Sequence, residues 1–248
     1  MRGCFKKPLV HDEAFVTSIV RYGESDCIVR LFVQEQGRIT AFFKNGLGLK
    51  KNNRGTVQSP AFARVAYTPR DEDKMARLDY LDLAPESFLW ASSLKLFAYG
   101  NYLAELLEKL LPEEEPATHV FSLLEETWHA CNSQGAQGYI LRAFELKLLK
   151  YLGYLPQIPH SLEARVFYDP IHCHFSVNDN RETYEFLGST LELAQALLIN
   201  PIGGFCCHEE QELVAIGRIF YSRLRLMNLL PLKSAIFFKA IASNQKSA

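Results

Sequence analysis

The stretch "AFVTSIVRYGESDCIVRLFVQEQGRITAFFKN", residues 14–45, decides the fold because three short apolar runs in it are separated by turn signals. The runs 14–23, 27–34 and 37–45 are rich in β-branched and aromatic residues, which favour strands. "GESD" and "EQG", which separate them, are typical of turns. The stretch therefore predicts three consecutive β-strands.

Two further strands are predicted downstream, in "AFARVAYT" (61–68) and "MARLDYLDL" (75–83). Alternation in 61–68 places one set of side chains on each face: Phe62, Arg64, Ala66 and Thr68 on one, Ala61, Ala63, Val65 and Tyr67 on the other. Five strands in the first 84 residues suit a small closed barrel, and a five-stranded OB-fold fits. An SH3-like barrel or an open sheet would give a similar pattern, so the class is better defined than the topology.

From Pro85 onward the pattern becomes helical. The leucines of the first helix recur at i, i+3, i+4, i+7 and i+8: Leu103, Leu106, Leu107, Leu110 and Leu111. One helix is expected from Pro85 to Pro112. Others are expected at 117–132, 137–152, 187–199, 208–229 and 232–243. Residues 154–186 are expected to be irregular, with a short hairpin through "ARVFY" and "CHFSV".

The predicted fold is therefore multi-domain β + α. An N-terminal OB-fold β-barrel occupies residues 1–84, and an all-helical domain with a small irregular or hairpin insertion occupies residues 85–248.

Composition gives little indication of partners, because the net charge of the 248 residues is only −1. No 18-residue apolar run is present, so no transmembrane helix is expected. The first residues contain no apolar region of the kind found in secretory signals. The six cysteines are scattered, which is typical of reduced thiols in a cytosolic protein.

The stretch "FFKNGLGLKKNNRG", residues 42–55, raises the possibility of a phosphate-binding loop. A dinucleotide fingerprint needs a third glycine and a following helix. Lys51 stands where that glycine should be, and the chain continues toward a strand. No Walker-type motif is present either, so nucleotide binding is not expected.

The same stretch belongs to a basic region, since no acid lies between Glu35 and Asp71. A barrel with a basic loop and aromatic strands favours binding of single-stranded nucleic acid, because cations follow phosphates and rings stack on bases. The candidate cations are Arg38, Lys44, Lys50, Lys51 and Arg54, with Lys6 and Lys7 as possible additions. The candidate rings are Phe42, Phe43 and Phe62. Phe42 and Phe43 are neighbours on a strand, so at most one is expected outside, and a merely solvated hairpin is the alternative.

Metal and catalytic chemistry have weaker support. "HCH" (172–174) and "CCH" (206–208) lack the C-x₂-C or H-x₃-H spacing of zinc sites. "HEEQE" (208–212) lacks the second histidine of H-E-x-x-H, and its acids suit the first turn of a helix. No nucleophile motif is present. We expect no catalytic residues, metal or cofactor. The alternative is a mixed site, which would suit a metal hydrolase and would comprise His172, His174, Cys206 and His208.

Four segments, in order, resemble the RecO family of bacterial recombination mediators and DNA-repair proteins. They are "RYGESDCIVRLFVQEQGRITAFFKNG", "GNYLAELLEKLLPEEEP", "ILRAFELKLLKYLGY" and "LPLKSAIFF", and the resemblance spans residues 14–240. It implies an OB-fold, a helical domain and no enzymatic turnover. It further implies binding of single- and double-stranded DNA, strand annealing, and loading of RecA onto DNA coated by single-strand-binding protein.

The resemblance also implies partners and a location. RecR is the usual partner of the family, and the acidic C-terminal tail of single-strand-binding protein docks on the helical domain. A cytoplasmic, nucleoid-associated protein is expected. The alternative is a protein-interaction adaptor whose barrel serves only as a scaffold.

The residue roles implied by the resemblance fall at two places. Lys44 stands at the lysine of the family's A-K-G, and Lys50, Lys51 and Arg54 stand for its following basic cluster. Arg142 matches an arginine of L-R-R-F-E-L and would hold the partner's terminal carboxylate, because a guanidinium binds one bidentately. Leu146 and Leu149 would flank it in an apolar groove, while a local pair between Arg142 and Glu145 is the alternative.

The chain also departs from the family's pattern. Ala143 replaces the second arginine of the helix motif, and Ala235 replaces an arginine near the C-terminus. The four-cysteine zinc site that many members carry is not expected, because residues 154–186 offer only Cys173.

Overall fold

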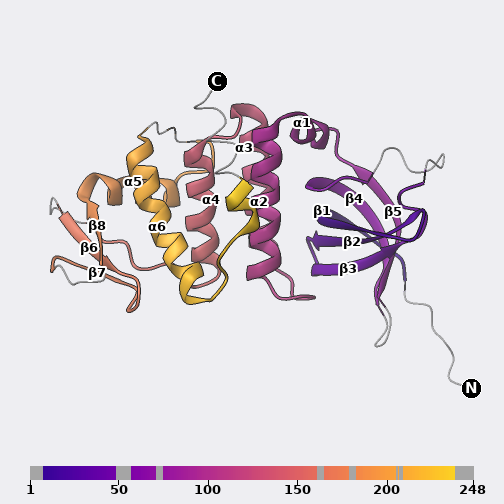
Figure 1. The fold of residues 1–248 in the computed structure, drawn as a ribbon, viewed down its shortest axis with the longest axis horizontal. Coiled ribbons are helices and arrows are strands. Elements are labelled where there is room, and N and C mark those ends of the chain that lie inside the picture. Colours follow the sequence, from indigo (N-terminus) through magenta and orange to yellow (C-terminus); the bar gives the residue numbers. More distant parts are fainter. Residues whose placement is uncertain are drawn as a thin grey trace, which may run out of the picture. The chain divides into compact units, whose positions relative to one another are not determined.

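The computed structural model describes residues 8–48, 57–70, 75–160, 165–178, 183–204, 206 and 209–237. All five predicted barrel strands are formed (Figure 1): β1 (Val10–Tyr22), β2 (Asp26–Val33), β3 (Gly37–Phe43), β4 (Ala61–Thr68) and β5 (Ala76–Leu83). They close into a barrel in the order β1-β2-β3-β5-β4, with β1 also paired to β4. β3 and β5 run parallel and the other pairs are antiparallel. The predicted OB-fold barrel is confirmed, and the open-sheet alternative is wrong.

The predicted alternation in β4 is confirmed by burial. Ala61, Ala63, Val65 and Tyr67 point into the barrel core, together with inward residues of the other strands. Phe62 and Arg64 point outward, where Phe62 is partly buried and Arg64 is exposed. Small and large side chains therefore share the narrow interior, as small barrels require.

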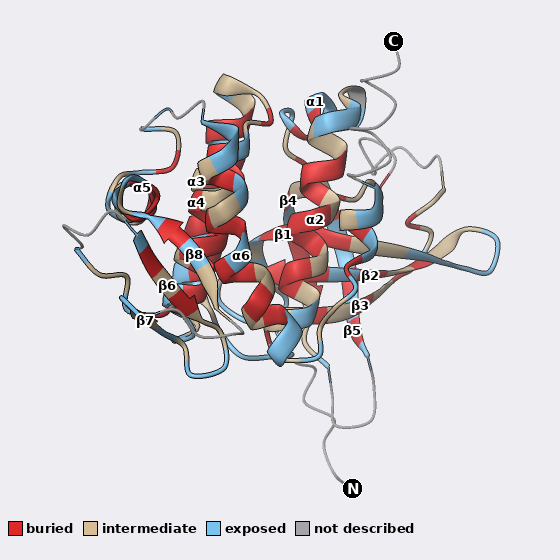
Figure 2. Cartoon of the chain, turned by 60° about the vertical axis from the view of Figure 1, so that its left-hand side comes forward, coloured by how far each residue is buried: buried red, intermediate tan, exposed pale blue. Residues whose placement is uncertain are grey.

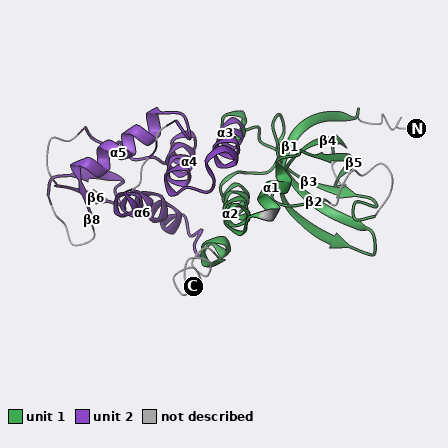
Figure 3. Cartoon of the chain, turned by 90° about the horizontal axis from the view of Figure 1, so that it is seen from above, with its two compact units in different colours: residues 1–121, 232–248 green, residues 122–231 purple. Residues whose placement is uncertain are grey.

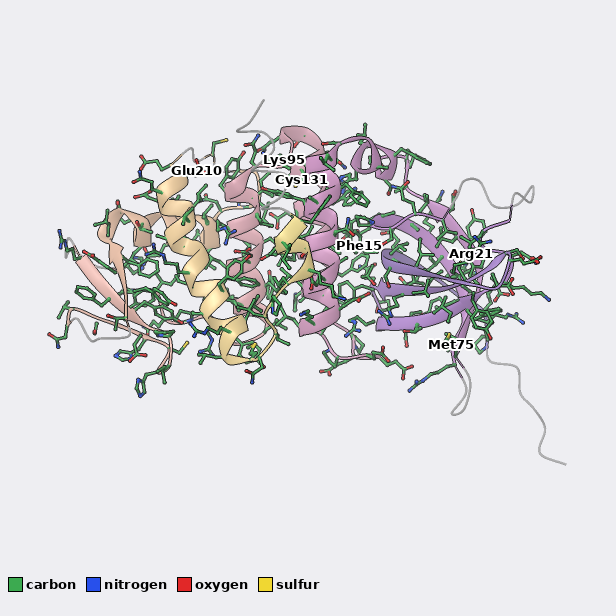
Figure 4. The ribbon with its side chains drawn as sticks, viewed as in Figure 1. Phe15, Arg21, Met75, Lys95, Cys131 and Glu210 are labelled. Atoms are coloured by element: carbon green, nitrogen blue, oxygen red, sulfur yellow. The ribbon has the colours of Figure 1, made fainter. Side chains whose placement is uncertain are left out.

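An aromatic cluster of Phe15, Phe32, Phe62 and Phe121 covers part of the outer face. The ring centroids of Phe15 and Phe62 lie 5.1 Å apart, and those of Phe32 and Phe121 lie 5.5 Å apart. Phe15, Phe32 and Phe121 are fully buried. Figure 4 shows Phe15 on the side of the barrel nearest α2, while Arg21 lies at the far end of the same strand. This part of the outer face is therefore a second apolar core.

The long helix expected from Pro85 to Pro112 is in fact two helices, α1 (Ser87–Ser92) and α2 (Leu94–Leu110). Ser93 between them has extended backbone, and its hydroxyl oxygen accepts a hydrogen bond from the main-chain N–H of Leu96. A serine suits this role because it satisfies a free N–H at the helix start. The leucine stripe alone gave no sign of this break.

The other predicted helices are present as α3 (Thr118–Gln134), α4 (Gly138–Tyr151), α5 (Gly188–Ile199) and α6 (Glu210–Leu226), and residues 233–237 are helical. The predicted hairpin is confirmed as β6 (Arg165–Asp169) and β7 (His174–Ser176). A further strand, β8 (Tyr184–Leu187), was not predicted and pairs with β6. None of the described helices is long and apolar enough to cross a membrane.

Two compact units make up the chain (Figure 3): residues 1–121 with 232–248, and residues 122–231. Unit 1 includes α2 as well as the barrel, and polar side chains join this helix to the barrel. Glu108 accepts a hydrogen bond from the hydroxyl of Thr17 at 2.8 Å and pairs with Arg30 at 3.3 Å. The predicted domain boundary after residue 84 separates strands from helices. The compact unit 1 instead includes α2, which these contacts join to the barrel.

Candidate nucleic-acid interface

Part of the outer face of β1, β2 and β3 lies beyond the aromatic cluster; we call it the bare face and define it as Val20, Tyr22, Ile28 and Phe42. Val20 lies opposite Ile28, and Ile28 lies opposite Phe42, so three of them form one row across the strands. Val20 is 51% exposed and Tyr22 is 59% exposed. Figure 2 shows that exposed surface predominates at the turn that joins β1 to β2. Large apolar groups at such a position are candidates for contact with a ligand.

Two aromatic rings of the bare face contact each other. The ring centroids of Tyr22 and Phe42 lie 5.8 Å apart, edge to face. Phe43 is only 3% exposed and belongs to the barrel core, so the prediction that at most one of the two phenylalanines faces outward is confirmed. Phe62 belongs to the aromatic cluster, and its candidate role as a stacking ring is therefore wrong.

Lys44 follows β3 directly and is exposed. The next residues are fixed to the β1–β2 turn: the main-chain N–H of Asn45 donates to Asp26 at 2.7 Å, and that of Leu47 donates to the Ser25 carbonyl at 2.9 Å. The basic stretch thus leaves the barrel from an anchored point beside the bare face. Lys50, Lys51 and Arg54, with Lys6 and Lys7, lie outside the described residues.

Arg38 has a structural role that sequence did not indicate. Its side chain is only 17% exposed; it donates to the Leu111 carbonyl and lies 3.9 Å from Glu113. The carbonyl of Arg38 also accepts a hydrogen bond from the main-chain N–H of Glu114. These contacts join β3 to the segment after α2, and we therefore remove Arg38 from the candidate DNA contacts.

Arg77 is a cation that sequence reasoning missed. It lies opposite Phe42 in the parallel pairing of β3 with β5, and its side chain is 64% exposed. Asp79 lies 2.9 Å from it. The pairing of β3 with β5 joins strands that are distant in sequence, so no local pattern placed Arg77 beside Phe42.

The predicted partner groove on α4 is not formed by the expected residues. Leu146 and Leu149 are completely buried, so the prediction that they line an open groove is wrong. Arg142 lies 2.5 Å from Glu145, which is the local pair that we gave as the alternative. Gly217 on α6 leaves space for the guanidinium, since a Cβ there would lie 2.4 Å from its Nη1.

A different concavity lies at the end of α4, with a volume of about 440 Å³. Apolar side chains line it, and Lys150 and His160 are exposed at its edge. The lining residues include Leu155, Pro156, Ile158, Leu198 and Ile199. We call it the α4 pocket. Its apolar lining and the adjacent ammonium group of Lys150 suit an apolar ligand that carries negative charge.

Of the candidate metal ligands, His172 and His174 lie together on the β6–β7 hairpin, with ring centroids 6.1 Å apart. His172 contacts Asp169 at 2.8 Å, and its hydrogen bonds hold the pKa of Asp169 below the ordinary value. Cys206 contacts the hydroxyl of Tyr139, whose pKa is raised to about 12 by burial and by this thiol. His208 lies outside the described residues. Within the described part of the chain, no three His, Cys, Asp or Glu side chains gather as a metal site would require.

The closed five-stranded barrel defines this chain as an OB-fold protein. Models of the RecO family match both parts of the chain: Recombination protein O N terminal over residues 7–85, and Recombination protein O C terminal over residues 91–225. The chain belongs to the RecO family.

Relatives described as DNA repair protein RecO are similar over most of the chain. The protein of Pelotomaculum thermopropionicum is 30% identical over 216 residues, which cover 83% of this chain and 80% of that protein. The protein of Myxococcus xanthus is 32% identical over 59% of each chain. That of Pelobacter propionicus is 33% identical over 61% of this chain and 60% of its own length. The alignments thus span from about three fifths to four fifths of these relatives.

Proposed function

We propose that this chain is a DNA-binding recombination mediator that acts in DNA repair without catalysing a reaction. It anneals complementary single strands and helps to load RecA onto DNA coated by single-strand-binding protein. Membership of the RecO family supports this role. The observation that carries it is the anchored basic stretch at Lys44, which leaves the OB-fold barrel beside the exposed ring of Tyr22 and the partly buried ring of Phe42.

The chemistry of annealing suits this arrangement. Two strands repel through their phosphates, and cations that neutralise phosphates remove that repulsion without reading sequence. Lys44, Lys50, Lys51 and Arg54 supply such cations, and Arg77 adds one on β5. Because phosphate contacts leave base edges free, two bound strands can still pair. Both single- and double-stranded DNA are therefore ligands, and no cofactor or metal is required.

The direct test is annealing of two complementary oligonucleotides, followed by loss of fluorescence from a paired dye and quencher. Wild-type protein should accelerate annealing, and Lys50/Lys51/Arg54→Ala should reduce that acceleration. If wild-type protein binds neither single nor double strands at low salt, the proposed function is wrong. Binding without acceleration would leave a DNA-binding protein but contradict the annealing role.

RecR and the tail of single-strand-binding protein are the proposed protein partners. For the tail, the α4 pocket replaces the groove expected around Leu146 and Leu149. An aromatic end group would enter its apolar part, while Lys150 attracts the acidic residues.

A labelled acidic peptide that ends in Phe tests this assignment. Lys150→Glu should weaken its binding at least tenfold, because an attraction becomes a repulsion. Arg218→Glu, an equal charge change at an exposed position on α6, should have little effect. Equal losses in the two variants would show only a general charge effect and would contradict the assignment.

The alternative is a protein-interaction adaptor with a scaffold-only barrel. It is favoured by three large apolar side chains that lie close together in sequence and are more than half exposed: Phe88 at 52%, Leu89 at 53% and Leu94 at 58%. DNA affinity that the Lys50/Lys51/Arg54→Ala variant leaves unchanged would favour the adaptor.

A metal hydrolase predicts stoichiometric zinc in the purified protein, which elemental analysis would detect. We further propose a cytoplasmic, nucleoid-associated location, which imaging of a fluorescent fusion tests.

A further inference from the structure

We propose that Tyr22 and Phe42 form a stacking platform for the bases of a single DNA strand. The inference rests on the proposed DNA binding and assigns the barrel face that meets the strand. In this arrangement the rings hold bases, while Lys44, which is exposed two residues beyond Phe42, holds a phosphate.

The first argument is the contrast between two ends of one sheet face. Phe32 on β2 and Tyr22 on β1 both point away from the barrel core. Phe32 is fully buried under Phe121, whereas Tyr22 is 59% exposed. The barrel interior already holds its own apolar side chains, so Tyr22 is not required for that core. A large exposed ring beside exposed Val20 is better explained by a ligand than by folding.

The second argument is the geometry of the rings. In an edge-to-face pair, the edge of one ring covers one face of the other. The pair itself therefore covers only one of the four ring faces. Tyr22, which is 59% exposed and whose ring centroid lies 5.8 Å from that of Phe42, therefore retains an aromatic face that a base can approach. Stacking on such faces accepts every base, because every base has a π-face. This sequence tolerance is what annealing of arbitrary strands requires.

The third argument is the charge around the platform, which favours a nucleic acid over an apolar protein segment. Arg77 lies opposite Phe42, and Lys44 lies two residues beyond it. Of the nearby acids, Asp26 accepts from the N–H of Asn45 and Asp79 pairs with Arg77, while Glu24 in the β1–β2 turn is exposed. Lys44 is exposed beside the rings, and the basic residues that follow it in the sequence, Lys50, Lys51 and Arg54, favour a polyanion as the ligand.

Full-length variants and a labelled thymidine oligonucleotide test the platform by fluorescence anisotropy. Tyr22→Leu should weaken binding roughly tenfold, because loss of one stacked base has an effect of this order. Its salt dependence should stay that of the wild type, because Tyr22 contacts no phosphate. Tyr22→Phe keeps the ring and should bind like the wild type. Tyr80→Leu is the matched control, because Tyr80 is 40% exposed on β5 of the same barrel.

Fluorescence of Tyr22→Trp gives a second readout that does not depend on affinity. Trp90 and Trp128 are buried, so the new tryptophan is an exposed reporter. Saturating oligonucleotide should quench it strongly if bases stack there. Wild-type affinity in Tyr22→Leu, or unquenched fluorescence of Tyr22→Trp at saturation, would overturn the platform. Either result would leave the proposed DNA binding itself intact.

Two further outcomes would also overturn the platform. If wild-type protein does not bind the oligonucleotide, the proposed function and the platform are wrong together. If Tyr22→Leu keeps DNA affinity but loses affinity for RecR, the bare face is a protein interface and the platform is wrong.

Discussion

Replacing Gly37 by alanine should destabilise unit 1 far more than the same change at Gly23. Gly23 lies in the β1–β2 turn and Gly37 is the first residue of β3, and both have positive φ, 70° for Gly23 and 72° for Gly37. A Cβ on Gly37 would lie 2.0 Å from the main-chain oxygen of Glu115, whereas a Cβ on Gly23 would meet nothing within 4 Å. The pair therefore separates the cost of backbone conformation from the cost of steric overlap.

The magnitudes follow from these two terms. The left-handed conformation costs alanine about 1–2 kcal/mol, which is the whole expected effect at Gly23. At Gly37 the backbone of Glu115 must also move, which adds about 1–3 kcal/mol. Gly37→Ala should thus lower the free energy of unfolding by about 2–5 kcal/mol.

Urea unfolding followed by the fluorescence of Trp90 measures both variants. Trp90 is fully buried in unit 1, and a Trp128→Phe background leaves it as the sole reporter. Equal destabilisation by the two alanines would refute the reasoning, because it would mean that the segment at Glu115 does not pack against the β2–β3 turn.

Three further predictions concern buried polar groups. Arg142→Met should cost about 3 kcal/mol because it leaves the carboxylate of Glu145, 1% exposed, without this partner; adding Glu145→Leu should restore most of the loss in urea unfolding. Burial opposes ionisation of Glu105, but hydrogen bonds from Ser234 hold its pKa below the ordinary 4.5. Glu105→Gln should therefore cost about 2 kcal/mol at pH 7, and the difference from wild type should shrink as the pH falls below 4.5; a constant difference would contradict this. Burial raises the pKa of Tyr67 to about 12, and its hydroxyl has no hydrogen-bond partner among the described residues. Tyr67→Phe should be neutral or stabilising by about 1 kcal/mol near pH 7, and should remove a loss of stability that the wild type shows from pH 10 to 12.

The strands were predictable because their signal is local. Turn residues and β-branched runs placed all five barrel strands within a few residues, and alternation alone separated Phe42 from Phe43. The break at Ser93 was not predictable in the same way, because a continuous leucine stripe crosses into α2 without showing where the chain bends.

The errors at the candidate sites have one cause, which is long-range packing. On α4, the spacing of Leu146 and Leu149 indicated one apolar stripe, but this helix is buried around most of its circumference. A residue in such a helix cannot be assigned to an open groove from spacing alone. Likewise, contacts with the segment after α2 engage Arg38, and pairing of β3 with β5 brings Arg77 beside Phe42.

The most direct test of the account is the salt dependence of single-stranded DNA binding by wild-type protein and by Lys50/Lys51/Arg54→Ala. Each neutralised phosphate contributes about 0.7 to the slope of log K against log salt, so the triple variant should bind more weakly with a slope shallower by about 2. The charge-matched control replaces three exposed arginines of unit 2 by alanine: Arg165, Arg218 and Arg225. That control should keep the wild-type slope. Unchanged affinity and slope in the Lys50/Lys51/Arg54 variant would contradict the assignment of DNA binding to the barrel's basic stretch.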